Sequence, residues 1–339
     1  MTGAEKAAAR LACEGTLSKA EILQLLETDS IDAFLREEAR RKADAVFGKA
    51  IYLRGLIEIS SYCKNDCFYC GLRRSNSGAA RYRLSEDEIL SACAEGYNAG
   101  IRTFVLQGGE DAYFTDARTA AIVTEIKRRY PDAAVTLSLG ERSWESYECL
   151  RKAGADRYLL RHETANEAHY EKLHPKEMRL SSRKKCLADL KGLGYQVGAG
   201  FMVGSPYQTM ENIAEDLLFL QEFAPHMIGI GPFIPQSATP HGTFPAGSLP
   251  LTIKLLSILR LMHPRVLLPA TTALATLSPT GREQGILAGA NVVMPNLSPA
   301  AVRGKYAIYD KKAFETIEDV RRKIEEIGYK IVNTRGDYQ

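Results

Sequence analysis

After residue 51, short apolar runs alternate regularly with helical patterns, and this rhythm constrains the fold more than any other feature of the sequence. Strands that alternate with helices predict a parallel sheet in the α/β class. Eight such units predict a closed (β/α)8 barrel of the TIM type. The eight expected strands cover residues 55–60, 102–107, 133–139, 156–161, 195–203, 226–233, 265–270 and 290–294.

The two ends of the chain read differently from the middle. Residues 1–50 show helical patterns without strands, so we expect an N-terminal helical extension there. The barrel should then occupy residues 51–310, with a C-terminal helix and a polar tail packing on it over 311–339. The alternative is an open doubly wound sheet. Against it, the loop after the first strand carries cysteines instead of a glycine-rich dinucleotide loop.

Composition excludes several classes of partner. The formal net charge is only +3, and the sequence lacks a block of basic residues, so we expect no nucleic acid and no anionic membrane surface as partners. No stretch approaches the roughly 20 apolar residues of a membrane span. The first residues are not followed by the apolar run of a signal peptide. We therefore expect a cytoplasmic protein.

Three of the seven cysteines, Cys63, Cys67 and Cys70, lie within eight residues directly after the first expected strand. In a barrel this loop opens at the C-terminal face, where active sites lie. Three thiolates can bind three irons of a 4Fe–4S cubane cluster and leave the fourth iron without a protein ligand. The amino and carboxylate groups of S-adenosylmethionine (SAM) can chelate that iron. An electron from the cluster can then break the adjacent C–S bond.

A structural zinc site is the alternative use of these cysteines. Such a site normally has four ligands, and no fourth Cys or His lies nearby in the sequence. The C-x3-C-x2-C spacing, with an aromatic residue before the last cysteine, therefore favours one cluster bound by three cysteines. The remaining cysteines lie in helical stretches, and we expect them to be packing residues.

The motif CKNDCFYC resembles that of the radical SAM superfamily. The chain after residue 51 is further similar to the FeFe-hydrogenase maturase HydE family, which shares the fold and cofactors expected above. The segments that carry this resemblance are residues 71–76, 81–83, 106–111, 136–141, 155–166, 198–200, 202–204, 229–235, 269–273 and 291–296. Some members of the family carry three further cysteines near the C-terminus for an auxiliary cluster. This sequence has none after Cys186, so that cluster is not expected.

The resemblance implies a set of SAM-binding residues, and physical chemistry agrees with several of them. Paired glycines let a ligand approach the backbone closely. A carboxylate can accept both ribose hydroxyls, and a guanidinium can clamp a carboxylate. A simple strand-end turn at the glycines and a structural Glu–Arg pair are the alternatives. The implied residues are Tyr69, Gln107, Gly108, Gly109, Ser138, Glu163, Arg183 and Tyr306, with Glu110 as an addition and Arg179 as a substitute for Arg183.

A second set resembles the substrate cavity of the family. Hydroxyl groups around one guanidinium suit a small anionic ligand, and a lone cation in the barrel mouth would be costly without an anion. Ordinary packing in the barrel layers is the alternative. The residues are Thr136, Arg161, Thr271, Thr272, Met294 and Tyr309, and Met227 is a further candidate.

The resemblance implies a radical SAM enzyme that cleaves SAM to methionine and a 5′-deoxyadenosyl radical. It further implies action on a cysteine-bound iron with carbonyl and cyanide ligands during assembly of the di-iron subcluster of FeFe-hydrogenase, with other hydrogenase maturases as partners. One alternative is a radical SAM mutase or synthase of the methylornithine-synthase or biotin-synthase type. The other is a structural or electron-transfer iron–sulfur protein without SAM.

Overall fold

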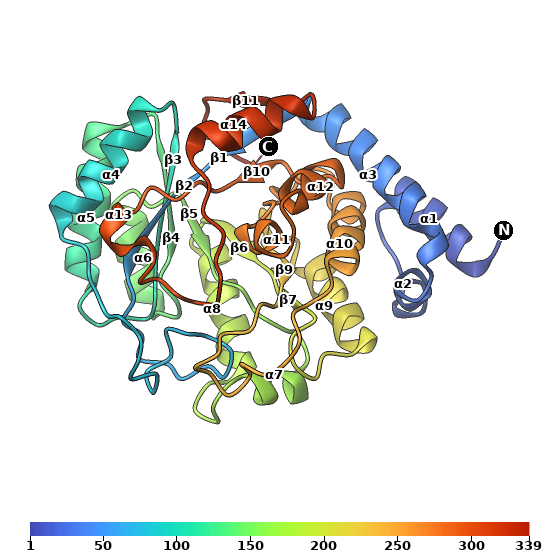
Figure 1. Cartoon of the computed structure of the whole chain (residues 1–339), viewed down its shortest axis with the longest axis horizontal. Helices are drawn as coiled ribbons and strands as arrows, with labels where there is room; N and C mark the ends of the chain where they lie inside the picture. Colours follow the sequence, from blue (N-terminus) through green and yellow to red (C-terminus); the bar gives the residue numbers. More distant parts are fainter. Residues whose placement is uncertain (339) are drawn as a thin grey trace.

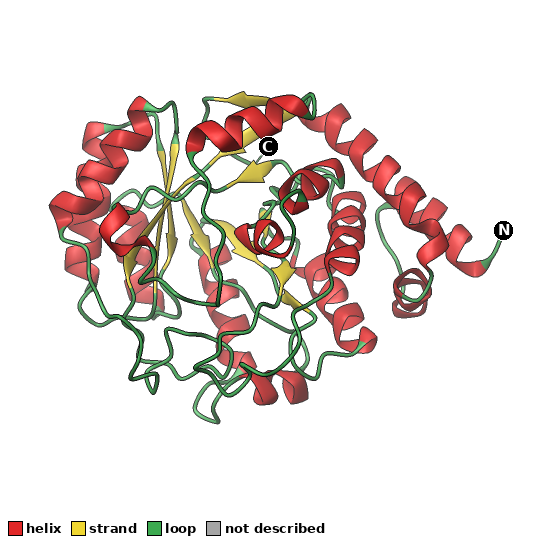
Figure 2. Ribbon diagram, viewed as in Figure 1, coloured by secondary structure: helices red, strands yellow, loops and turns green. Residues whose placement is uncertain are grey.

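The computed structural model describes residues 1–338, and the predicted barrel is present (Figures 1 and 2). Six parallel strands form a sheet in which each strand pairs with the next. Three isolated parallel bridges, Met227 with Leu267, Pro269 with Val292 and Leu56 with Asn296, carry the pairing back to the first strand and close the circle. The sheet strands are β2 (Gly55–Ser60), β3 (Thr103–Gly108), β4 (Ala134–Ser138), β5 (Arg157–Leu159), β6 (Gln196–Ala199) and β8 (Met227–Ile228).

The last two units of the barrel are the least regular. The segment predicted as a strand over 265–270 takes part only through the bridges at Leu267 and Pro269, and β10 (Val292–Val293) follows it. Two predicted long strands each break into two. β7 (Met202–Val203) follows β6, and β9 (Gly231–Pro232) follows β8. At the breaks the two backbones approach closely, and only glycine fits at position 200, because a Cβ there would lie 2.0 Å from the Gly229 carbonyl oxygen.

Helices surround the barrel, as Figure 2 shows in red around the yellow strands. The predicted capping box at Ser85 is present: its hydroxyl accepts a hydrogen bond from the Glu88 amide, and the Glu88 side chain accepts one in return. Thr209 caps another helix in the same way. The helices are α4 (Glu86–Asn98), α5 (Asp116–Arg129), α6 (Trp144–Lys152), α7 (Glu167–Leu173), α8 (Leu180–Gly192), α9 (Met210–Phe223), α10 (Leu249–Met262), α11 (Thr272–Leu277), α12 (Gly281–Leu287) and α13 (Ala300–Arg303).

The N-terminal helices pack against one side of the barrel rather than over its mouth (Figure 1, blue). α1 (Gly3–Glu14), α2 (Lys19–Leu26), the short η1 (Asp29–Ile31) and α3 (Asp32–Phe47) contact α9 and α10. Lys254 of α10 is 4% exposed and forms an ion pair with Asp32 at 2.9 Å. The division of the chain into units at residues 50 and 310 stays a prediction.

The C-terminal tail corrects one expectation. α14 (Ile317–Glu326) matches the predicted helix, but the polar tail that follows it forms β11 (Lys330–Val332). β11 pairs with β1 (Ala50–Leu53), a strand that the sequence reading also missed. Beyond it, Asp337 forms an ion pair at 2.6 Å with Arg157, which is fully buried at the start of β5. The tail therefore covers the bottom of the barrel, opposite the cysteine loop.

None of the helices within residues 1–338 has the length and apolar character needed to cross a membrane.

Candidate active site

A cavity of about 380 Å³ lies inside the barrel, at the C-terminal ends of the strands. Strand register explains part of its polar lining, because Glu58 pairs with Gln107 and Gln107 pairs with Ser138 across three neighbouring strands. The cavity brings together fourteen of the predicted site residues: Cys67, Tyr69, Cys70, Gln107, Gly108, Ser138, Arg161, Glu163, Arg183, Thr271, Thr272, Met294, Tyr306 and Tyr309.

Loop contacts fix the cysteine loop above this cavity. Arg81 is the central brace, since its guanidinium donates to four carbonyl oxygens, including that of Ser61 at 2.5 Å and that of Leu72 at 2.9 Å. Arg73 and Asp66 form a second brace at 2.8 Å across the loop. These contacts hold the backbone on both sides of the three thiols without using the thiols themselves.

The thiols Cys63, Cys67 and Cys70 are free and partly buried. Burial raises the pKa of each, and it raises the pKa of Cys70 to about 12. Binding of iron would therefore have to displace protons from these thiols. Across residues 1–338, no three His, Cys, Asp or Glu side chains converge on a single ion. A cubane cluster does not require such convergence, because each cysteine binds a separate iron.

Tyr69 is oriented by a stack of buried rings. Its hydroxyl lies 3.2 Å from His174 Nε2, and the two rings meet edge to face. His174 in turn stacks on Tyr170 with ring centroids 3.9 Å apart. Burial lowers the pKa of His174 to about 3, so this imidazole is neutral at physiological pH. The Tyr170 hydroxyl is buried and has no hydrogen-bond partner in the described structure.

The geometry distinguishes Arg183 from Arg179. Arg183 lies in the first turn of α8, lines the cavity and is 8% exposed. Glu141 accepts from its Nε at 2.5 Å, and the Arg161 carbonyl accepts from its Nη1 at 2.8 Å. Arg179 is the exposed N-cap residue of the same helix and does not line the cavity. Of the two, only Arg183 is held in place toward the cavity, and Glu141 is a contributor that the sequence reading missed.

Glu163 and Arg161 show the features of a site arranged for a ligand. Glu163 has a φ of +68°, a conformation that costs about 1–3 kcal/mol in a residue other than glycine and is concentrated at functional sites. Its Oε2 lies 3.2 Å from Arg161 Nη2 without hydrogen-bond geometry. These two atoms, Arg161 Nε and Thr271 Oγ1 are buried without a hydrogen-bond partner in the described chain. Unpaired polar atoms of this kind fit a polar ligand in the cavity.

Six predicted residues do not line the cavity: Cys63, Gly109, Glu110, Thr136, Arg179 and Met227. A Cβ on Gly109 would come within 2.6 Å of the Cβ of Cys63, so Gly109 packs against the cysteine loop. Glu110 pairs with Lys64 at 3.1 Å. Thr136 lies one layer deeper, where it lines a space of only about 20 Å³ together with Met227.

Two further charged residues line the cavity but were missed from the sequence. Glu58 is completely buried in β2, and Lys312 forms an ion pair with it. A signal for Glu58 was present, since it is the one charged residue in the otherwise apolar or small run GLIEIS. Lys312 had none, because it lies in an irregular segment far from the cysteines in the sequence.

Comparison with known proteins agrees with the fold and the cysteine loop. The family model of the radical SAM superfamily matches residues 57–220. The chain is 46% identical over 278 residues to the FeFe hydrogenase maturase subunit HydE of Thermotoga maritima, covering 82% of this chain and 78% of that protein. It is 29% identical to the 3-methylornithine synthase of Methanosarcina acetivorans, covering 92% of this chain and 88% of that one.

Solved structures show the same barrel. A crystal structure of methylornithine synthase superposes with a TM-score of 0.86 at 27% identity, covering 96% of this chain and 97% of that one. A structure of the FeFe-hydrogenase maturase HydG superposes with a TM-score of 0.81 at 21% identity, covering 98% and 76% of the respective chains, and that likeness supports the fold alone. The chain is a radical SAM enzyme that belongs to the FeFe-hydrogenase maturase HydE family.

Proposed function

We propose that this enzyme cleaves SAM reductively inside the barrel and acts on a small cysteine-bound iron compound with carbonyl and cyanide ligands, in assembly of the di-iron subcluster of FeFe-hydrogenase. One observation carries the proposal: two of the cluster cysteines, the candidate SAM-binding residues and the candidate substrate-binding residues all line the same cavity. The similarity to the HydE protein of Thermotoga maritima supports the reaction class.

In this proposal Cys63, Cys67 and Cys70 bind one 4Fe–4S cluster. A bound, reduced cluster supplies the electron that breaks the C–S bond of SAM and releases methionine and a 5′-deoxyadenosyl radical. The protein supplies position and exclusion of water, because the barrel encloses the reacting groups.

Separate groups hold the different parts of SAM. The Arg183 guanidinium, fixed by Glu141, clamps the methionine carboxylate with its remaining N–H groups. Glu163 accepts hydrogen bonds from the ribose hydroxyls, and its unpartnered Oε2 is available for this. Tyr69 contacts the adenosyl group. The remaining proposed SAM contacts are Gln107, Gly108, Ser138 and Tyr306, which border the same cavity.

The substrate occupies the deeper part of the cavity. Arg161 and the hydroxyl groups of Thr271, Thr272 and Tyr309 hold its anionic iron and cysteine portions, while the Met294 thioether contributes an apolar contact. Thr136 lies below this layer and contacts the substrate only if the ligand reaches past Met294. A partner maturase delivers the compound at the barrel mouth.

A second function has specific support. The methylornithine synthase structure matches over nearly the whole of both chains, which favours the same barrel and cofactors with an amino-acid substrate. The two functions differ in the charge that the cavity must accommodate: an anionic iron complex in one and a side-chain ammonium of lysine type in the other.

An anaerobic turnover assay separates the two. The reconstituted enzyme receives SAM, a reductant and either a cysteine-iron-carbonyl-cyanide compound or L-lysine, and 5′-deoxyadenosine is quantified. The proposal expects the iron compound to stimulate product formation and Arg161→Gln to abolish the stimulation without loss of basal SAM cleavage. If L-lysine stimulates product formation and the iron compound does not, the proposed function is wrong and a synthase with an amino-acid substrate is favoured.

A further inference from the structure

The segment of residues 304–316 borders the mouth of the barrel between α13 and α14, and we refer to it as the strap. Three hydrogen bonds attach it to separate parts of the barrel: the cysteine loop, the segment after β9 and helix α11. Gly71 of the cysteine loop donates to the Ile308 carbonyl at 3.0 Å, Asp310 donates to the Pro235 carbonyl at 3.1 Å, and Ala313 donates to Thr276 Oγ1 at 3.0 Å. These hydrogen bonds fix the strap in place at the mouth, so its side chains form part of the wall between the barrel interior and the solvent.

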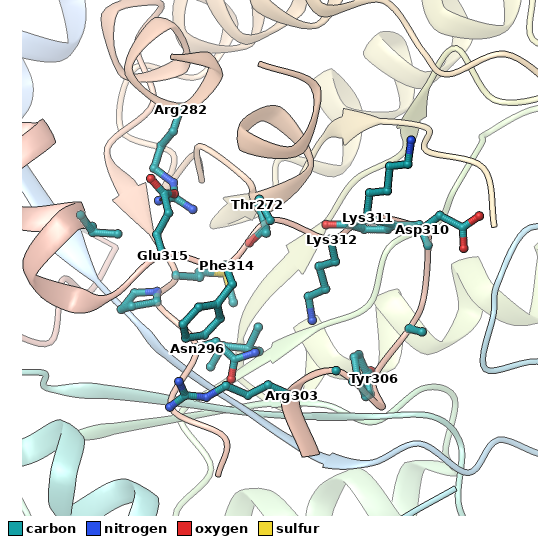
Figure 3. A pocket seen from close by; sticks show the side chains of 18 of the residues that line it. Thr272, Arg282, Asn296, Arg303, Tyr306, Asp310, Lys311, Lys312, Phe314 and Glu315 are labelled. Atoms are coloured by element: carbon teal, nitrogen blue, oxygen red, sulfur yellow. The ribbon is translucent and has the colours of Figure 1, made fainter. Parts of the chain in front are cut away.

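Lys312 extends from the strap into the barrel interior. It lines both the inner cavity and an outer cavity of about 470 Å³ (Figure 3). Its ammonium pairs with the carboxylate of Glu58, which is 0% exposed and also accepts from Asn296 Nδ2 at 2.9 Å. Figure 3 shows the neighbouring Lys311 side chain running in the opposite direction.

A carboxylate buried as deeply as Glu58 stays ionised only with a cation beside it. In a cavity without such a cation, a ligand that carries an ammonium group can supply the positive charge, and the buried carboxylate then favours that ligand. In this chain the cation is part of the protein. An incoming ammonium would have to displace Lys312, while an incoming anion would not.

The charges around the cavity agree with this. Three cationic and two anionic side chains line it, and Lys312 supplies the cationic excess. Arg161 Nη2 and Glu163 Oε2 are both buried without hydrogen-bond partners in the described chain. With Glu163 assigned to the SAM ribose, Arg161 is the charged group that remains for a second ligand.

We propose that Lys312 determines the charge specificity of the inner cavity: by neutralising Glu58 from within the chain, it makes the barrel accept small anions and reject ligands that present an ammonium group. The inference rests on the proposed function only in taking this cavity as the place of the substrate.

Equilibrium binding to the reconstituted enzyme with SAM and without reductant tests the inference, because no turnover occurs. The ligands are cadaverine and glutarate, which have the same carbon-chain length and opposite charge. The variants are Lys312→Met, the double variant Glu58→Gln/Lys312→Met, and Lys311→Met as the matched control from the same strap.

The wild-type enzyme and Lys311→Met are expected to prefer glutarate. Lys312→Met should gain about tenfold or more in cadaverine affinity and lose affinity for glutarate, since a buried charge pair is being reformed with the ligand. The double variant should lose the cadaverine gain, which a purely structural role of Lys312 would not predict. Unchanged cadaverine binding in Lys312→Met, or a gain that persists in the double variant, overturns the inference.

If the Lys312→Met variant does not fold, the Glu58→Gln variant provides an independent test by the same binding measurement. It frees the Lys312 ammonium, so glutarate affinity should rise severalfold, and no rise contradicts the inference. Because every measurement is of binding, an enzyme that fails to turn over the iron compound but shows the charge inversion would contradict the proposed function and leave this inference standing.

Discussion

Replacing Asp337 with alanine should destabilise the protein although this residue lies two positions from the C-terminus. Its carboxylate accepts from Arg157 Nη2 at 2.6 Å and from Gln196 Nε2 at 3.1 Å, and it pairs with Arg335 at 2.9 Å. Arg157 is 0% exposed, so its cation has no access to water at this end of the barrel. The substitution removes the only carboxylate with which Arg157 forms an ion pair in residues 1–338.

The size of the stability loss depends on the hydrogen bonds that Arg157 keeps in the Asp337→Ala variant. Arg157 keeps hydrogen bonds to Thr103 Oγ1, Gln196 Oε1 and the Arg335 carbonyl, so its N–H groups are not orphaned. Arg157 loses one charge-assisted contact, worth about 1.5–3 kcal/mol when buried. The contacts of Asp337 with Gln196 and with the partly exposed Arg335 are lost as well, and we expect them to add little. Asp337 is 37% exposed, which reduces that value. We expect a loss of about 2 kcal/mol in the free energy of unfolding.

Urea unfolding of the cluster-free protein, followed by circular dichroism at neutral pH, measures this loss. The double variant Arg157→Met/Asp337→Ala should be more stable than Asp337→Ala, because it removes the buried cation together with its partner. Glu326→Ala is the control, since it breaks an exposed pair with Arg322 and should cost under about 0.5 kcal/mol. The reasoning is refuted if Asp337→Ala matches the control, or if the double variant is the less stable of the two.

Three further predictions concern the site and the pH dependence. Glu141→Ala should weaken SAM binding about tenfold by releasing the arginine that it anchors, while Glu148→Ala on the exposed face of α6 should not, as titration calorimetry can show. Gly109→Ala should lower the iron content after reconstitution, because its Cβ would lie 2.3 Å from a loop carbonyl oxygen, whereas Gly108→Ala, with 3.4 Å to its nearest atom, should reconstitute normally. Burial lowers the pKa of His263 to about 4, so the unfolded chain binds more protons than the folded one below about pH 6.5. Stability should therefore fall between pH 6.5 and 4, and His263→Gln should flatten that part of the urea-midpoint profile.

Much of the fold could be predicted because local patterns and long-range pairing agree. The capping box at Ser85 and the strands from 55–60 to 156–161 are visible in the sequence and present in the structure. The position of the strand over 265–270 could be predicted from the sequence. That it pairs only through two isolated bridges could not, since this depends on the geometry of barrel closure. The tail after Gly328 reads as polar because its charged groups bind buried partners from β5, and those partners are invisible locally.

The site shows the same division. Residues inside motifs, such as Cys67 and Glu163, were found because a spacing or a resemblance identified them. Glu141 and Lys312 act through partners distant in the sequence, and only the folded chain brings them to Arg183 and Glu58. Thr136 was assigned to the substrate by resemblance, and its contact with the substrate stays a prediction. The structure adds that its side chain borders a small space below the main cavity, a depth that alternation along a strand does not reveal.

The most direct test of the central claim is SAM cleavage by the reconstituted protein. The protein is loaded anaerobically with iron and sulfide, reduced with dithionite and incubated with SAM, and 5′-deoxyadenosine is quantified by chromatography. We expect product from the wild-type chain and none from Cys63→Ala, Cys67→Ala or Cys70→Ala. The variant Cys93→Ala, which changes a buried cysteine of α4, should retain product formation. A wild-type protein that holds a reduced cluster and yields no 5′-deoxyadenosine would contradict the account.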